Sequence, residues 1–437
     1  MNTNNIFKPI NKKELQTAVN EWCANKKTAK QKFGPINTWD TSLIKDMYRL
    51  FKDKEKFNDN ISNWNVSNVS TMESMFENAK SFNKSLNKWD TQKVKNMTAL
   101  FKNAIKFNKS LNKWNVCNVN NMRSMFENAQ SFNKPLNKWN TQKVQNMISM
   151  FKNANSYNQT ISNWNVNNVK KMNNMFEYAK SFNIPLSAWN TSNVINMEFM
   201  FKNAIKFNQN ISNWDVSNVT TMESMFENAY TFNKPLNKWN TQKVENMKKM
   251  FKNAIIFNEN ISNWNIYNVK TLESMFYDAH SFNQPLSKWS TNNVISMESM
   301  FQNAYTFNND ISKWNFKKVT TTKNMFNNAI SFNGNITNWG FYKINDISYM
   351  FKNAKSFNRD LSYWRFYNNY GPFIVLETKD MFLDSGLEIK NIPIWYKNIY
   401  NEDDEDYEDD EDYEDDDDED YEDDDEDYEI YDDLLIL

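Results

Sequence analysis

The sequence has little of the residue types from which catalytic and metal sites are built. Its 437 residues include one histidine, two cysteines and five glycines. His280 stands alone, and neither Cys23 nor Cys117 has a nearby partner. No Ser-His-Asp set, metal-ligand spacing or phosphate-binding glycine loop can be assembled, so we expect no enzymatic activity and no metal or cofactor. The lack of a disulfide framework favours a reducing, intracellular compartment.

Long apolar runs are also missing. No stretch approaches the ~18 apolar residues of a membrane span; residues 373–376 and 434–437 are the nearest candidates. The polar stretch from Met1 to Lys13 predicts no secretory signal. We therefore expect an intracellular protein with no membrane span.

Charge is balanced overall but divided along the chain. The net charge is −3, yet residues 401–437 hold 26 of the 54 Asp and Glu and none of the 51 Lys and Arg. Residues 1–400 therefore carry 51 − 28 = +23. A basic body followed by an acidic tail is the pattern that a function must explain.

Tryptophan, by contrast, is abundant and evenly spaced. Fourteen tryptophans follow one another at intervals of 25 residues, which composition alone cannot produce and which identifies a tandem repeat. They are Trp39, Trp64, Trp89, Trp114, Trp139, Trp164, Trp189, Trp214, Trp239, Trp264, Trp289, Trp314, Trp339 and Trp364.

Each repeat is expected to form one short helix and one short strand. Val69, Met72, Met75, Phe76 and Ala79 recur at spacings of three and four, the period of a helix with one buried face. A brief extended piece follows, ending near the next Trp. The predicted fold class is an α/β repeat solenoid, a leucine-rich-repeat-like stack of 25-residue coils. The Met, Phe and Trp columns are interpreted as its core.

The ends of the array differ from its middle. Asn11 and Glu14 have the spacing of a helix N-cap, and Leu15, Ala18, Val19 and Trp22 share a helical face. We predict four parts: an N-terminal capping helix in residues 1–36, repeats in 37–364, a degenerate C-terminal capping coil in 365–400 and a disordered acidic tail in 401–437.

One asparagine follows the second aromatic residue of every coil. A buried amide there could satisfy backbone groups and link neighbouring coils, so we interpret this column as a structural asparagine ladder. It comprises Asn58, Asn83, Asn108, Asn133, Asn158, Asn183, Asn208, Asn233, Asn258, Asn283, Asn308, Asn333 and Asn358.

A second period, of 50 residues, overlies the first. The residue after the paired Phe alternates between Lys and Glu, from Lys52 and Glu77 to Lys252. If equal positions stack, each Lys should lie between two Glu of neighbouring coils. A slip by one coil would then oppose like charges, so the alternation is expected to specify register.

The string MFENAKSFNKSLNKWDTQKVKNM at residues 75–97 resembles the repeat of BspA-like leucine-rich-repeat proteins, known from mycoplasma surface lipoproteins and large DNA viruses. The resemblance covers roughly residues 11–396. It implies a solenoid for adhesion or protein binding without enzymatic activity. Heavy use of Asn, Lys and Ile is consistent with the AT-rich genome of a large virus or a protist; for a viral protein the location would be the host cytoplasm or the virion.

Two functional hypotheses remain. The first is a non-enzymatic protein–protein interaction scaffold with an unknown partner. The alternative is nucleic-acid or polyanion binding by the basic solenoid, autoinhibited by the acidic tail. A lysine row before Trp is the candidate interaction surface, unless it only solvates the protein: Lys88, Lys113, Lys138, Lys238, Lys288 and Lys313. Lys93, Lys143 and Lys243 form a second column. Arginine is scarce, so base-specific readout is unsupported.

Overall fold

A computed structural model of the chain describes residues 6–365 and 376–401. The chain divides into two compact units, Met1–Pro393 and Ile394–Leu437. The first unit contains the helices α1 (Lys12–Ala24) and α2 (Lys26–Phe33), the 3-10 helix η1 (Ile36–Thr38), the repeats, and the 3-10 helix η2 (Ile389–Asn391). The second contains α3 (Ile394–Asn401). From residue 402 on, the predicted acidic tail lies outside the described residues, as do residues 366–375 of the predicted terminal coil.

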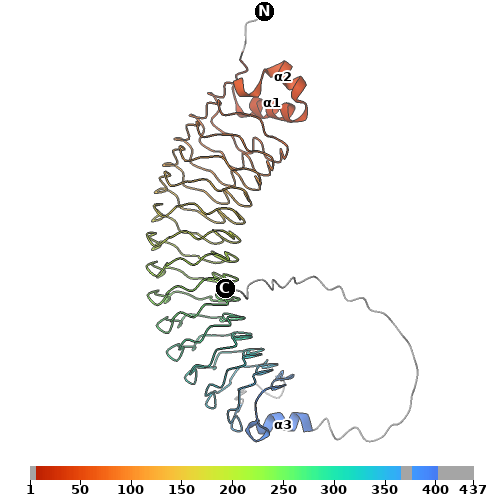
Figure 1. Cartoon of the computed structure of the whole chain (residues 1–437), viewed down its shortest axis with the longest axis vertical. Helices are drawn as coiled ribbons and strands as arrows, with labels where there is room; N and C mark the ends of the chain where they lie inside the picture. The colour runs from red at the N-terminus through yellow and green to blue at the C-terminus, as the bar shows by residue number, and fades with distance from the viewer. Residues whose placement is uncertain (1–5, 366–375, 402–437) are drawn as a thin grey trace, which may run out of the picture. The chain divides into compact units, whose positions relative to one another are not determined.

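The repeats form a solenoid, in which each coil lies directly on the next (Figure 1). Thirteen parallel bridges join equivalent residues of successive coils, beginning with Asp46 and Thr71 and ending with Asp346 and Glu377. Each bridge involves a single residue of each coil, and that residue has the same repeat position in both. Equal repeat positions therefore lie one above the other, and their side chains form columns along the stack.

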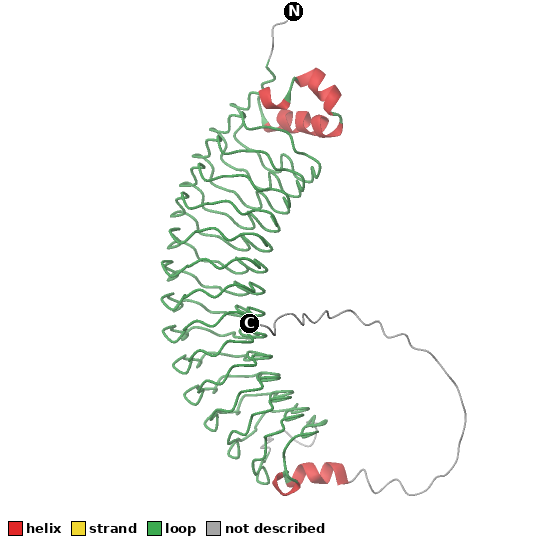
Figure 2. Cartoon of the chain, viewed as in Figure 1, coloured by secondary structure: helices red, strands yellow, loops and turns green. Residues whose placement is uncertain are grey.

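The prediction of a short helix and a short strand in each coil was wrong. Residues 39–364, all of which the structure describes, contain neither element, and the coils are built from consecutive turns (Figure 2). Two residues per coil have positive φ, such as Ser74 at 55° and Asn78 at 61°. Counted from the Trp, these are positions 10 and 14. A left-handed residue every fourth position stops an α-helix of L-amino acids before it can propagate.

Alternate backbone N–H groups in these turns point to different partners. The N–H groups of Ser74 and Phe76 donate to the carbonyls of Thr98 and Leu100 in the next coil, at 2.8 and 2.9 Å. Between them, the N–H of Met75 donates to Met72 O, three residues back, at 3.1 Å. The same pattern recurs along the stack. Some backbone N–H groups of these turns thus bond to the next coil, as in a sheet, and the others bond within their own coil, as in a tight helical turn. Because the two kinds of bond alternate along the chain, neither a continuous strand nor a continuous helix forms.

The core consists of stacked apolar columns, as the sequence predicted. Phe76 and Phe82 of one coil lie with ring centroids 4.2 Å apart, and each stacks on its equivalent in the next coil, at 5.5 Å for Phe101 and 5.9 Å for Phe107. The fourteen repeat tryptophans are 1–4% exposed. From Trp64 on, every indole N–H donates to a backbone carbonyl of the preceding coil, as in Trp114 to Leu86 O at 2.8 Å.

The N-terminal capping helix forms where it was expected. Asn11 caps α1 by accepting from the N–H of Glu14 at 3.0 Å, and Leu15, Ala18, Val19 and Trp22 are its buried residues. Trp22 lies edge-on to Trp39 of the first coil, with centroids 5.8 Å apart. The helix therefore covers the open end of the stack. The second helix, α2, was not predicted; Asn25 caps it by accepting from the N–H of Thr28 at 3.2 Å.

A last coil follows Trp364. Phe382 stacks on Phe351 at 5.8 Å, and Met381 is fully buried. Gly386 lies against the preceding coil so closely that a Cβ there would be 2.2 Å from Lys355 O. Residues 376–393 thus continue the stack, whereas Ile394 starts a helix, α3, inside the stretch predicted as a capping coil.

Candidate interaction surfaces

The asparagine column at position 19 links every coil to the next. The side-chain oxygen of Asn58 accepts from the backbone N–H of Asn83 at 2.9 Å, and the same bond recurs without a gap to Asn358, which accepts from Glu388 N–H at 3.1 Å. The side chains are half-buried or exposed, not buried as the sequence interpretation assumed. Their role in this geometry is to join coils at the surface.

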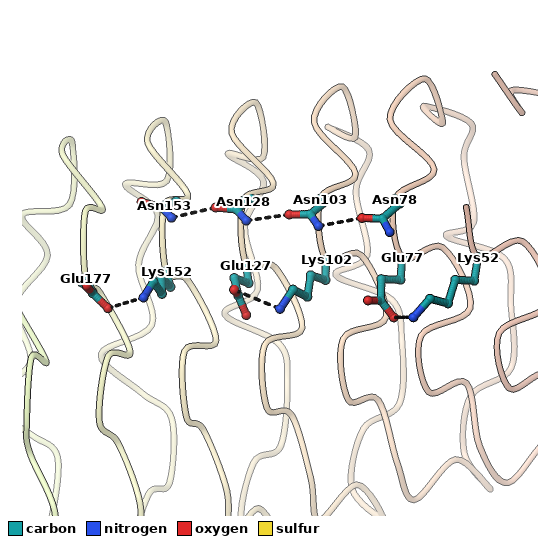
Figure 3. A network of polar contacts seen from close by, with 10 residues as sticks. All are labelled: Lys52, Glu77, Asn78, Lys102, Asn103, Glu127, Asn128, Lys152, Asn153 and Glu177. Carbon is teal, nitrogen blue, oxygen red and sulfur yellow. Dashed lines mark hydrogen bonds and ion pairs between the residues drawn. The ribbon is translucent and has the colours of Figure 1, made fainter. Parts of the chain in front are cut away.

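A second asparagine column, which the sequence analysis missed, lies at position 14 (Figure 3). Here the amides bond to one another: Asn103 donates to Asn78 at 2.6 Å, Asn128 to Asn103 at 2.5 Å, and Asn153 to Asn128 at 2.7 Å. Tyr178 interrupts the column. These residues have positive φ, which Asn tolerates better than most residues, so the repeated Asn was the signal that could have revealed them.

The Lys and Glu of the 50-residue period pair, but not continuously. Lys52 bonds Glu77 at 2.9 Å, Lys102 bonds Glu127 at 3.0 Å, and Lys152 bonds Glu177 at 2.7 Å (Figure 3). Lys202 and Glu227 form the last pair, at 3.0 Å. Within the part of the column that the structure describes, no ion pair joins a Glu to the Lys of the following coil. Equal positions do stack, so a Lys such as Lys102 lies between the Glu of two neighbouring coils, but it forms an ion pair with only one of them.

The lysine row before the tryptophans is exposed along its whole length. The stack brings together Lys88, Lys113 and Lys138 in three successive coils and Lys288 with Lys313 in two others, whereas Lys238 has no lysine beside it in this row. No described residue forms an ion pair with these six side chains. The second column differs, because Lys93, Lys143 and Lys243 each donate to an asparagine one coil back, at 2.6–2.7 Å.

A row of isoleucine, tyrosine and histidine side chains, also missed from the sequence, occupies position 16 of six consecutive coils. We call it the apolar strip; it consists of Ile205, Tyr230, Ile255, His280, Tyr305 and Ile330. Its side chains are half-buried or exposed, with Tyr230 at 36% and Ile330 at 43%. Of the six earlier coils, five have a polar residue at this position and one has Ile105; the polar residues are Glu55, Lys80, Gln130, Asn155 and Lys180. The uninterrupted run from Ile205 to Ile330 thus occurs in one part of the stack.

Contacts within the apolar strip hold its members side by side. The rings of His280 and Tyr305 stack with centroids 4.5 Å apart. The carbonyls of Ile205 and His280 accept from threonine hydroxyls of the next coil, Thr231 at 2.9 Å and Thr306 at 2.7 Å. Partial burial, and to a lesser extent Tyr178, raises the pKa of Tyr230, so its hydroxyl stays neutral at physiological pH.

Groups suited to catalysis or metal binding do not gather in the described parts of the chain. These parts contain no cluster of three or more His, Cys, Asp or Glu side chains that could hold a metal ion. His280 has only Asp278, at 3.9 Å, as a carboxylate neighbour among the described residues. No helix in the described ranges is both long and apolar enough to cross a membrane.

The fold and surfaces define a repeat solenoid. Residues 17–137, 107–213, 207–307 and 283–385 match the family described as mycoplasma protein of unknown function, DUF285. Because these matches cover most of the sequence, the chain belongs to this family.

Other comparisons add little. A search of curated proteins found no match. Among solved structures, a chain from a crystal structure of a TLR13–ssRNA13 complex aligns at 10% identity with a TM-score of 0.17, over 69% of this chain and 51% of that chain. This chain thus spans about half of that one, and so low a TM-score supports no statement about fold or function.

Proposed function

We propose that the protein is a non-enzymatic protein-interaction scaffold of the BspA-like type and that the apolar strip is its binding surface. The observation that carries this proposal is the strip itself. Single exposed apolar residues are common on any protein, but a contiguous row is characteristic of an interaction site. The core columns do not need these side chains, because other coils stack with Lys, Gln or Asn at the same position.

The solenoid also supplies the rigidity that such a surface needs. Backbone bonds between coils and the threonine bonds to the carbonyls of Ile205 and His280 fix the backbone beneath the strip before any partner binds. Little conformational entropy is then lost on binding, which favours affinity. Ile256, 44% exposed and next to Ile255, widens the apolar area. The partner expected is a protein that offers an apolar segment.

The test is a comparison of two matched triple variants of the full chain. I205N/Y230N/I255N removes half of the apolar strip, and asparagine already occupies this position at Asn155. L43N/I195N/I295N removes three apolar side chains that are 42–47% exposed, elsewhere on the solenoid. Partners are captured from extract of the source organism, identified by mass spectrometry, purified and titrated against each protein.

We expect the strip variant to weaken binding at least tenfold and the control variant to change it less than threefold. The titration is done at ~0.5 M salt, because a mainly electrostatic complex would be screened there. A partner that binds both variants equally well would show that the strip is not the binding surface. A partner lost only at high salt would point to the charged surfaces instead.

A further inference from the structure

Three consecutive coils carry a dense, regular set of lysines. Residues 83–89 and 108–114 both read NKSLNKW, and residues 133–139 read NKPLNKW. Each of these connectors, which lead into the Trp, has a lysine at its second and sixth positions. We call the six residues the lysine grid: Lys84, Lys88, Lys109, Lys113, Lys134 and Lys138. Only one other connector, residues 233–239, has both lysines, and it stands alone.

The charges of the lysine grid are uncompensated. None of the three connectors contains Asp or Glu, and no carboxylate of the described residues lies within 4.0 Å of a grid ammonium group. The carboxylate nearest in sequence, Asp90, accepts from the backbone N–H of Gln92 at 3.1 Å. By contrast, Lys52, Lys102, Lys152 and Lys202, at position 13, each pair with a Glu of the next coil. Six adjacent positive charges therefore remain available to a ligand.

The backbone beneath the lysine grid is held in place. Leu86 O accepts from the indole N–H of Trp114 at 2.8 Å, and Leu111 O from that of Trp139 at 3.0 Å. The N–H groups of Lys113 and Lys138 donate to asparagine side chains of the preceding coils, Asn87 at 3.1 Å and Asn112 at 3.0 Å. The Cα positions are thus preorganised, and binding needs to order only the lysine side chains.

The repeat distance of the lysine grid suits an extended polypeptide. Near these connectors, equivalent rings are 5.9 Å apart for Phe82 and Phe107 and 6.2 Å apart for Trp89 and Trp114. Side chains on one face of an extended strand recur about every 6.6 Å. A chain lying along the solenoid axis can therefore place every second side chain over successive lysines. Lysine stems are flexible enough to absorb the small difference.

Nucleic acid fits this surface less well. No large apolar or aromatic side chain between residues 44 and 194 is exposed, so bases would find no stacking platform. The grid contains no arginine, the residue suited to bidentate phosphate and base contacts. We propose that the lysine grid is a second binding site, independent of the apolar strip, for an extended acidic segment of a partner protein.

The test uses the full chain and two variants with the same change in net charge. The grid variant is K84Q/K88Q/K109Q/K113Q/K134Q/K138Q. The control variant is K170Q/K206Q/K270Q/K317Q/K343Q/K355Q, at exposed lysines without ion pairs among the described residues. Glutamine occurs naturally in three connectors, at Gln159, Gln209 and Gln284, so both proteins are expected to fold. Both keep residues 401–437, and any effect of that acidic segment is common to them.

Binding of fluorescent poly-L-glutamate and of a single-stranded oligonucleotide of equal charge is measured by anisotropy over a salt series. We expect the grid variant to lose at least tenfold in poly-L-glutamate affinity at ~50 mM salt, with a shallower salt slope, and the control variant to lose less than threefold. Equal losses would mean that net charge alone attracts the ligand. Tighter, grid-dependent binding of the oligonucleotide, or no poly-L-glutamate binding by the wild type, would also overturn the proposal.

Discussion

At the scale of single residues, one hydroxyl stands out in the core. Tyr157 occupies position 18, where the other twelve coils between Phe57 and Phe357 have phenylalanine. It is fully buried and stacks on Phe132 at 5.8 Å and Phe182 at 6.3 Å. Its hydroxyl oxygen has no hydrogen-bond partner among the described residues. A buried, unpaired hydroxyl costs free energy that phenylalanine would not.

Tyr157→Phe is therefore expected to raise the free energy of unfolding by about 1 kcal/mol at pH 7. Burial also raises the pKa of Tyr157 well above its ordinary value. The unfolded protein then loses this proton before the folded protein does, so the wild type loses stability as the pH rises past about 10, and the variant, which lacks this contribution, should lose less. Urea unfolding at pH 7 and pH 10.5 measures both effects.

The control for this substitution is Tyr267→Phe, because Tyr267 is 52% exposed. We expect no measurable change in stability there at pH 7. If Tyr157→Phe instead destabilised the protein, the hydroxyl would have to be paired, with ordered water as the most direct source of a partner.

At the scale of the coil, sequence reasoning found the columns but not the backbone. Period, core positions and the face of α1 follow from apolar spacing, and all agree with the structure. Helix and turn, however, share a spacing of three to four residues: Met72, Met75 and Phe76 fit a helix but belong to successive turns. The left-handed residues at positions 10 and 14 distinguish the turns from a helix. In the sequence, the repeated Asn at position 14 was the one signal of this left-handed conformation.

The interaction surfaces were predictable to different degrees. The lysine row could be located from its fixed distance to Trp, because that spacing alone fixes its place in each coil. The apolar strip was missed because Ile205, Tyr230 and Ile255 look unrelated until position 16 is compared coil by coil. The alternation of Lys and Glu could not show which of two neighbouring Glu each Lys pairs with. That choice depends on side-chain geometry, as in the pairing of Lys52 with Glu77.

Replacing Asn128 by glycine and by alanine distinguishes turn from helix. Asn128 has φ 58° and bonds Asn103 and Asn153 through its side chain. Both variants lose these bonds, but only alanine keeps a Cβ in the left-handed region. We expect Asn128→Gly to be more stable than Asn128→Ala by roughly 1 kcal/mol in urea unfolding.

A helix would give the opposite order, because glycine in a helix interior is about 1 kcal/mol worse than alanine. The control pair is Lys106→Gly and Lys106→Ala, at an exposed residue outside the positive-φ positions. There alanine should be at least as stable as glycine. Should alanine also be the better residue at Asn128, the left-handed conformation of position 14 would be wrong.

At the scale of the whole solenoid, the structural unit is a pair of coils. Thr141 is buried and donates to Asn165 O in the next coil at 2.8 Å, and Lys152 bonds Glu177 across the same interface. Glu177 is 7% exposed and needs that partner. Each coil contacts only its neighbours, so stability is set by the sum of these interfaces. The coil that carries Thr141 and Lys152 and the coil that carries Glu177 are therefore not interchangeable.

Deleting one coil should harm the protein more than deleting two. Removing residues 140–164 takes away Thr141 and Lys152 and sets Glu177 beside Glu127. Removing residues 140–189 takes both partners of each interaction and places the coil of Lys202 after that of Glu127, which restores the alternation. We expect the one-coil deletion to be less stable than the two-coil deletion by about 1–3 kcal/mol, although it is the longer protein.

Thermal unfolding of the two deletion proteins provides the measurement, and a third deletion isolates the charge. Removing residues 290–314 takes away Thr291, which donates to Asn315 O at 2.9 Å, but position 13 there holds only Gln302 and Asn327, which carry no charge. Its Tm should therefore lie above that of the 140–164 deletion. High salt should reduce this difference in Tm, because it screens the repulsion between Glu127 and Glu177 in the 140–164 deletion. If the Tm values followed chain length alone, the alternation would be a trace of how the sequence grew by duplication and would not specify register.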